Sequence, residues 1–215
     1  MRALVRHSRA AAPWGLVGVT AVCTVVLLLL VAYRPAVTWP LHGAAIGLVA
    51  GVSAWTVDEP CAAVVDVTAR PLWWRTAARA PAGLLLLAVW TTTHVVIAAR
   101  LPDRLPVFVL QGAGAAVGGF AAATWQRSRG SAEPGHALAL VACPLAAAVA
   151  LAKPGDGVLP LFPVWPSDDW ARATAIWAVE AAVAAVVLGA SLGRDAASRR
   201  GARVGGVTTV VRSTS

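Results

Sequence analysis

The sequence predicts an all-α membrane protein: a bundle of six transmembrane helices with both termini in the cytoplasm. Three observations predict this fold class. Of the 215 residues, 58% are hydrophobic and only 13% are charged, whereas soluble domains carry about 25% charged residues. Six apolar runs approach or reach the length that crosses a hydrocarbon core of about 30 Å. Lys and Arg gather in alternate links between these runs, as they do in cytoplasmic loops.

Charged or proline-rich stretches set the limits of the six predicted spans. The spans cover residues 14–33, 38–57, 81–99, 105–125, 137–152 and 170–192. The basic start of the chain resembles a signal peptide, but the first run is about 20 residues long, beyond the 7–15 of a signal-peptide core, so we expect an uncleaved span. No run alternates apolar and polar residues as a membrane β-barrel does, which leaves a helical bundle.

The distribution of basic residues predicts the orientation. With the N-terminus inside, thirteen of the eighteen Lys and Arg residues fall in cytoplasmic segments and five in outer segments. The net charge of +8 therefore follows from topology, and we expect no nucleic-acid partner. The Arg-, Ala- and Val-rich composition is typical of high-GC bacteria, so the predicted location is the bacterial cell membrane.

The parts outside the spans differ in length and composition. Residues 1–13 form a predicted cytoplasmic N-terminal segment, residues 14–192 the six-span domain, and residues 193–215 a partly disordered cytoplasmic tail. The longest cytoplasmic link, 58–80, is predicted to contain a short surface helix over 61–69, because a proline precedes an apolar stretch there. The outer link 153–169 combines four prolines with apolar pairs, and we expect it to dip into the outer leaflet.

Glycines recur at four-residue spacing in two of the predicted spans. Such stripes let helices approach closely. The first alternative is a moving or dimer contact, and the second is ordinary packing within one subunit. The predicted helix-packing glycines are Gly43, Gly47 and Gly51 in the second span, with Gly114 and Gly118 in the fourth.

Three polar residues lie at similar predicted depths inside the spans. Glu180 is about 15 Å below the outer boundary, and His94 and Gln111 are about one helical turn shallower. Ionisable residues within a membrane point to function by default. We expect these three residues to share a polar layer, which is either a hydrogen-bonded packing cluster or a path for a polar substrate or a proton.

The 58–80 link offers acidic, apolar and Arg/Trp surfaces within a short distance. It is either a docking surface for another protein or a solvated loop. No catalytic, nucleotide-binding or metal-binding motif occurs in the chain, and we expect no enzyme activity, metal or cofactor. The candidate docking residues are Asp58, Glu59, Arg70, Trp73, Trp74, Arg75 and Arg79.

Three short motifs resemble those of a transporter family. Asp58-Glu59-Pro60 follows the second span, Pro71-Leu72-Trp73-Trp74-Arg75 enters the third, and Arg194-Asp195 with Arg199-Arg200 follows the sixth. The pattern resembles six-span permeases of the ABC-2 exporter type in high-GC bacteria. The resemblance implies a coupling helix in the 58–80 link and a partly re-entrant segment between the last two spans. It also implies two partners, a separate ATP-binding subunit and a second permease copy or paralogue.

The resulting expectation is a permease-like membrane subunit of an ABC-type exporter, energised by ATP hydrolysis on another protein. One alternative is an assembly or scaffold factor that resembles a permease and transports nothing. Another is a membrane-embedded enzyme that uses His94 and Glu180. The whole chain contains only four His, which argues against the enzyme.

Overall fold

The described part of this protein is all-helical. The computed structural model describes residues 8, 11–59, 71–98, 105–152, 160–163 and 168–211, and for residues 35, 36 and 195–211 it describes the backbone only. These residues contain no strand. Six long helices and the four-residue α3 make up the fold: α2 (Trp14–Tyr33), α3 (Pro35–Thr38), α4 (Pro40–Trp55), α6 (Leu72–Ile97), α7 (Leu105–Ser128), α8 (Pro134–Ala152) and α9 (Trp170–Val211).

Five of these helices are long and apolar enough to cross a membrane. They are α2, α6, α7, α8 and the part of α9 from Trp170 to Arg194. α4 is apolar too, but its 16 residues give a helix only about 24 Å long, short of the ~30 Å hydrocarbon core. The all-helical class is thus confirmed for the described residues, and five helices of membrane-spanning length and composition support the multi-pass prediction. The sixth span and the cytoplasmic location of the termini stay predictions.

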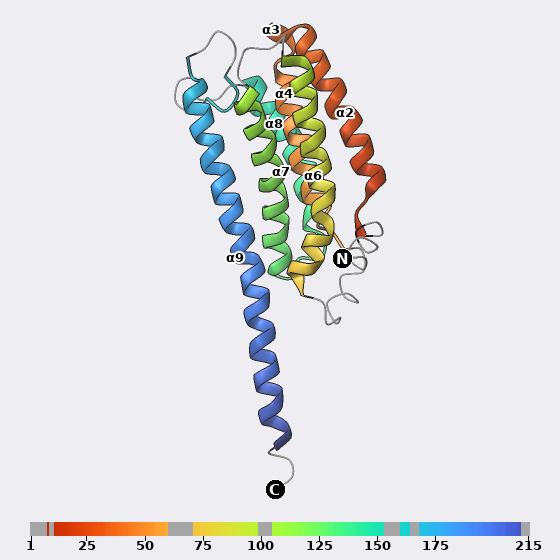
Figure 1. The fold of residues 1–215 in the computed structure, drawn as a ribbon, viewed down its shortest axis with the longest axis vertical. Coiled ribbons are helices and arrows are strands. Elements are labelled where there is room, and N and C mark those ends of the chain that lie inside the picture. The colour runs from red at the N-terminus through yellow and green to blue at the C-terminus, as the bar shows by residue number, and fades with distance from the viewer. Residues whose placement is uncertain are drawn as a thin grey trace.

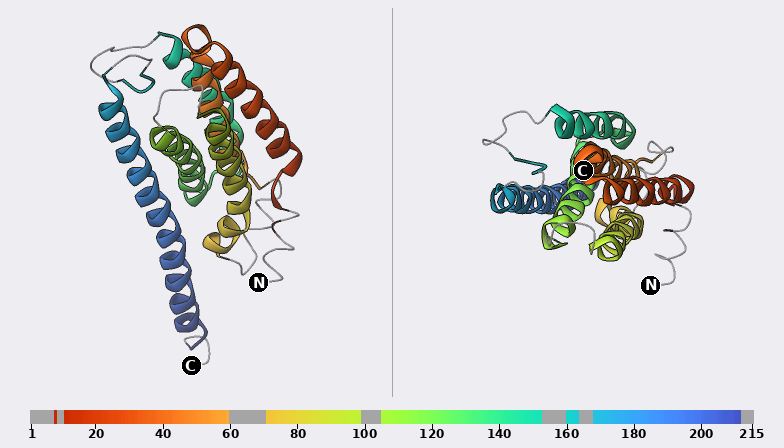
Figure 2. Two further views of the ribbon diagram at one scale, coloured as in Figure 1. Left: turned by 45° about the horizontal axis from the view of Figure 1, so that its top comes forward. Right: turned by 90° about the horizontal axis from the view of Figure 1, so that it is seen from above.

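α4 occupies the centre of the bundle. It packs against α2, α6, α7 and α8, and the view along the bundle in Figure 2 has these helices around it. α9 attaches to the bundle mainly through α7. The start of α2 and the end of α9 lie toward the same end of the molecule (Figure 1). The ends of α4 and α7 and the starts of α6 and α8 meet at this end, which we call the lower end.

The predicted span limits hold to different degrees. α2 coincides with the predicted 14–33, whereas α8 begins at Pro134, three residues before the predicted 137. Among the helix starts, the largest difference is in α6, which starts at Leu72, nine residues ahead of the predicted 81–99. Pro81 suggested a helix start, but it lies inside the helix, and the loss of its N–H removes one backbone hydrogen bond. The second half of the predicted cytoplasmic link is therefore the first part of α6.

α9 extends well into the tail. It continues as one helix to Val211, within the residues 193–215 that we expected to be partly disordered. Ala and Arg favour a helix over 194–203, and no proline interrupts the sequence after Gly193. Figure 1 shows this extension projecting beyond the lower end of the bundle. The predicted helix over 61–69 and most of the outer link lie outside the described residues.

The first glycine stripe is an internal packing surface. A Cβ atom added at Gly47 would lie 2.6 Å from the Cα of Cys143, and one at Gly51 would lie 3.0 Å from the Cα of Ala139. Gly43 faces Ala146 in the same way. The stripe therefore lets α4 and α8 approach at backbone distance within one subunit. Of the two alternatives for this stripe, the contacts support packing within one chain.

Candidate functional site

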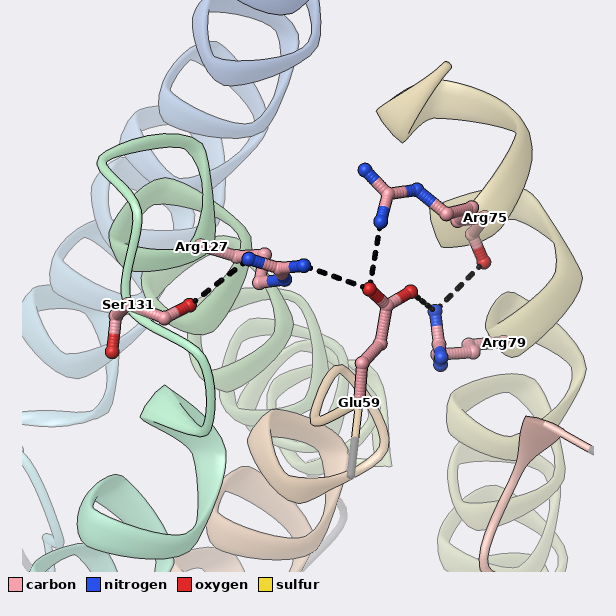
Figure 3. Close-up of polar contacts among 5 residues, drawn as sticks. All are labelled: Glu59, Arg75, Arg79, Arg127 and Ser131. Carbon is pink, nitrogen blue, oxygen red and sulfur yellow. Dashed lines mark hydrogen bonds and ion pairs between the residues drawn. The ribbon is translucent and has the colours of Figure 1, made fainter. Parts of the chain in front are cut away.

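One carboxylate at the lower end is surrounded by three guanidinium groups. Glu59 accepts hydrogen bonds from Arg75 at 2.7 Å and Arg79 at 2.7 Å, both on α6, and from Arg127 on α7 at 2.9 Å. Figure 3 shows the three arginines converging on it from two sides. All four side chains are at most 7% exposed. We call these four residues the Glu59 cluster.

Helical spacing explains how the cluster forms. Arg75 and Arg79 are four residues apart in the first two turns of α6 and thus share one face. Arg127 lies in the last turn of α7, and it also donates to the carbonyl of Ser131 beyond the helix end. Glu59 follows the end of α4. One side chain therefore connects three helices at the lower end of the bundle.

The electrostatics favour an ionised Glu59. Burial by itself would raise the pKa of this carboxyl, but the hydrogen bonds and positive charges of Arg127, Arg79 and Arg75 outweigh it and hold the pKa below its ordinary value. Buried arginines of this kind need a counter-charge, because an unpaired buried charge is costly. The cluster is thus a buried ion-pair network that holds the ends of α4, α6 and α7 together.

Asp58 forms a second connection between helices, through hydrogen bonds to α8. Its two carboxylate oxygens accept the backbone N–H groups of Gly135 at 2.6 Å and His136 at 2.7 Å, in the first turn of that helix. These donors have no partner within the helix, and a carboxylate at a helix N-terminus is favourable. Burial nevertheless raises the pKa of Asp58, against the effect of the two N–H donors.

The predicted docking residues thus have different surroundings. Glu59, Arg75 and Arg79 are buried and paired with one another, and Asp58 is 9% exposed. Trp73 is 52% exposed near the start of α6, and Trp74 is half-buried. Arg70 lies outside the described residues. The docking role stays a prediction, and on the described part of the link the exposed Trp73 offers the largest apolar surface for it.

A buried polar and aromatic cluster lies at the opposite end, which we call the upper end. His42 of α4 is 3.0 Å from the Oε1 atom of Gln111, and His94 shares a hydrogen bond of 2.9 Å with the carbonyl of Trp90. The two imidazole centroids are 5.6 Å apart. Both histidines and Gln111 are at most 1% exposed. The surrounding aromatic rings belong to Trp39, Trp90, Phe108 and Trp170.

Glu180 lies apart from this cluster. Its carboxylate oxygens face Gly114 and Gly118 of α7, so that a Cβ atom at either glycine would collide with them. Among the described residues, its buried Oε2 atom has no hydrogen-bond partner. The expected polar layer thus divides: His94 and Gln111 meet through His42, and Glu180 faces the second glycine stripe one to two turns along α7 from Gln111. A hydrogen-bonded packing cluster that includes Glu180 is therefore not found among the described contacts.

Two members of these sites were missed by sequence reasoning. His42 is ionisable and lies inside a predicted span, so the rule that selected Glu180 would have selected it too. Arg127 had no such signal, because 68 residues separate it from Glu59. Only the packing of α7 beside α4 brings these two residues together.

The described side chains include no group of three or more His, Cys, Asp or Glu residues that would hold a metal ion. A scan against protein-family models and searches of curated proteins and of solved structures find no match to this chain. What the chain does must therefore be argued from its own geometry.

Proposed function

We propose that this chain is the permease-like membrane subunit of a transport complex, an exporter driven by ATP hydrolysis on a separate ABC-type subunit. Several apolar helices are long enough to cross the membrane. Polar side chains inside the bundle can bind a polar substrate or an ion on its way across. In a complex of this kind, movement of the ATP-binding subunit has to reach the membrane helices.

The attachment of the link after α4 carries the proposal. The link leaves the bundle at Glu59 and returns at Leu72, and both ends are fixed to several helices. Glu59 is bonded to α6 and α7, Asp58 caps α8, and Arg75 and Arg79 fasten the start of α6. A partner that pulls on this link would move the lower ends of four helices together. This mechanical connection is what a coupling segment needs.

The test uses the exposed Trp73 as the docking contact. Full-length chain is purified in mild detergent, and the co-purifying ATPase activity and its protein are measured. Trp73→Ala should lower the bound ATPase several-fold, because it removes a large aromatic anchor of the kind that dominates interfaces. Tyr33→Ala is the matched control, since Tyr33 is 72% exposed at the upper end. Equal ATPase binding by both variants, or no ATPase with either, contradicts the proposal.

The internal use of the charges favours a second candidate, a non-transporting assembly or scaffold factor. Glu59, Arg75 and Arg79 satisfy one another inside the chain, which suits a rigid support. The two functions differ in one measurement. An ATP-binding partner stimulated by a transported compound supports the transporter, whereas a stable complex with another membrane protein and no stimulated hydrolysis supports the scaffold.

A further inference from the structure

We propose that Glu180 forms a proton-binding site at the contact between α7 and α9, in which the carboxyl takes up and releases a proton within the membrane. The site is a carboxyl set against two glycines at mid-depth in the bilayer. It does not depend on an ATP-binding partner, so it stands or falls separately from the proposed transport role.

The position of Glu180 along α9 places it deep in the membrane. It is the only charged residue between Arg172 and Arg194. At 1.5 Å per residue, Glu180 is about 12 Å from the first of these and about 21 Å from the second along the helix axis. The apolar span of α9 runs from Trp170 to Arg194, so the carboxyl lies within its middle part.

The contact with α7 fixes where the carboxyl points. One oxygen faces Gly114 and the other faces Gly118, and any larger side chain at either position would occupy the same space. The neighbouring turn of α9 is held in place by Trp177, which donates a hydrogen bond of 3.0 Å to the carbonyl of Leu161. The two glycines thus make room for this carboxyl on the face of α7.

Among the described residues of the helices packed against it, no counter-ion faces the carboxyl. Residues 105–126 of α7 contain no acidic, basic or histidine side chain. α6 carries His94 in the buried upper cluster, and its Arg75 and Arg79 are bonded to Glu59 at the lower end. A bare charge at this depth is costly, because hydrocarbon solvates it poorly. The neutral acid removes that cost, so a proton is the ligand that suits the site.

The experiment uses full-length protein in lipid vesicles and dicyclohexylcarbodiimide, a membrane-soluble reagent that attacks protonated carboxyls. The acid adds across the carbodiimide, its proton passes to nitrogen, and rearrangement leaves an N-acylurea heavier by the whole reagent. Peptide mass spectrometry should find this adduct on Glu180, formed faster at mildly acidic than at alkaline pH. Glu180→Gln should lose the adduct completely.

A matched glycine pair tests the geometry. Gly118→Ala should displace the carboxyl from α7 toward lipid and speed labelling several-fold, whereas Gly189→Ala adds the same methyl group in open space and should leave the rate unchanged. Absence of the adduct at every pH overturns the proposal. So does equal labelling by a water-soluble carbodiimide, because the carboxyl would then face water, and so does equal labelling of the two glycine variants.

Discussion

Glu59 is the residue on which the lower end of the bundle most depends. Its single negative charge lies among three buried guanidinium groups, and it accepts hydrogen bonds with both oxygens. Replacing a buried ionic group with well-packed apolar residues can be tolerated, but removal of one partner leaves the others charged and buried. The carboxylate should thus be more costly to remove than the solvent-exposed acids among the described residues.

Glu59→Gln should therefore destabilise the protein by about 3 kcal/mol or more, because three buried arginines lose their counter-charge. Asp169→Asn is the control. Its pair with Arg172 is 3.3 Å long and solvent-exposed, so the change should cost less than about 1 kcal/mol. Thermal unfolding of both variants in the same detergent measures the difference, and equal midpoints would refute the role of this ion-pair network.

The same cluster predicts a dependence on pH. The pKa of Glu59 is lowered on folding, so its contribution to stability is present above its ordinary pKa of 4.5 and is lost as the pH falls through the lowered value. The stability difference between the wild type and Glu59→Gln should shrink as the pH falls below about 4.5. The pKa of Asp58 is raised, so its contribution to stability changes with pH in the opposite sense. Both proteins keep Asp58, so this contribution cancels when their free energies of unfolding are subtracted. A constant difference down to the lowest pH tolerated would exclude this linkage.

At the scale of elements, the contact between α4 and α8 is set by small residues. α4 is central and short, and its glycine stripe allows α8 to pack at backbone distance. Lipid provides no hydrophobic force between helices, so close packing is what holds such pairs together. A methyl group added in this contact would clash with backbone atoms of α8. Backbone atoms cannot move away by a rotamer change, as a side chain can.

Gly47→Ala should destabilise the fold by roughly 1–3 kcal/mol, because the new Cβ would meet the Cα of Cys143 and the carbonyl of Ala142. Gly83→Ala is the control: nothing lies within 4 Å of its added Cβ. The control should be neutral or gain up to about 1 kcal/mol of helix propensity. Denaturant unfolding followed by circular dichroism compares them. Equal free energies of unfolding for the two variants would contradict the role of the glycine stripe in packing α4 against α8.

For the whole molecule, the lower end holds Arg75, Arg79, Arg127 and Arg129 among the described residues, and it is predicted to face the cytoplasm. Single cysteines at Val37 and Arg129, in a chain with its native cysteines replaced, probe the two ends because both positions are exposed. A membrane-impermeant maleimide added to intact cells should label position 37 and spare position 129. The reverse pattern would invert the topology, and labelling of both positions would break the six-span scheme.

The composition and the apolar runs were sufficient to predict the class of fold. Membrane helices must satisfy their backbone hydrogen bonds internally, so apolar length alone predicts each span. The limits were less certain where proline was involved, because Pro81 is tolerated inside α6 rather than at its start. Gly43, Gly47 and Gly51 were predicted as a packing face from spacing alone, whereas nothing in the spacing identified α8 as their partner.

Local composition and the length of each apolar run are sufficient to predict a helical, apolar, multi-pass chain, because those properties do not depend on distant contacts. Contacts between distant residues follow only from how the helices pack in three dimensions. This packing pairs Glu59 with Arg127 and joins His94 and Gln111 through His42. It also places Glu180 against two glycines of α7, apart from His94 and Gln111. Such contacts depend on the rotation and depth of each helix relative to its neighbours, and no short-range pattern along one chain fixes these quantities.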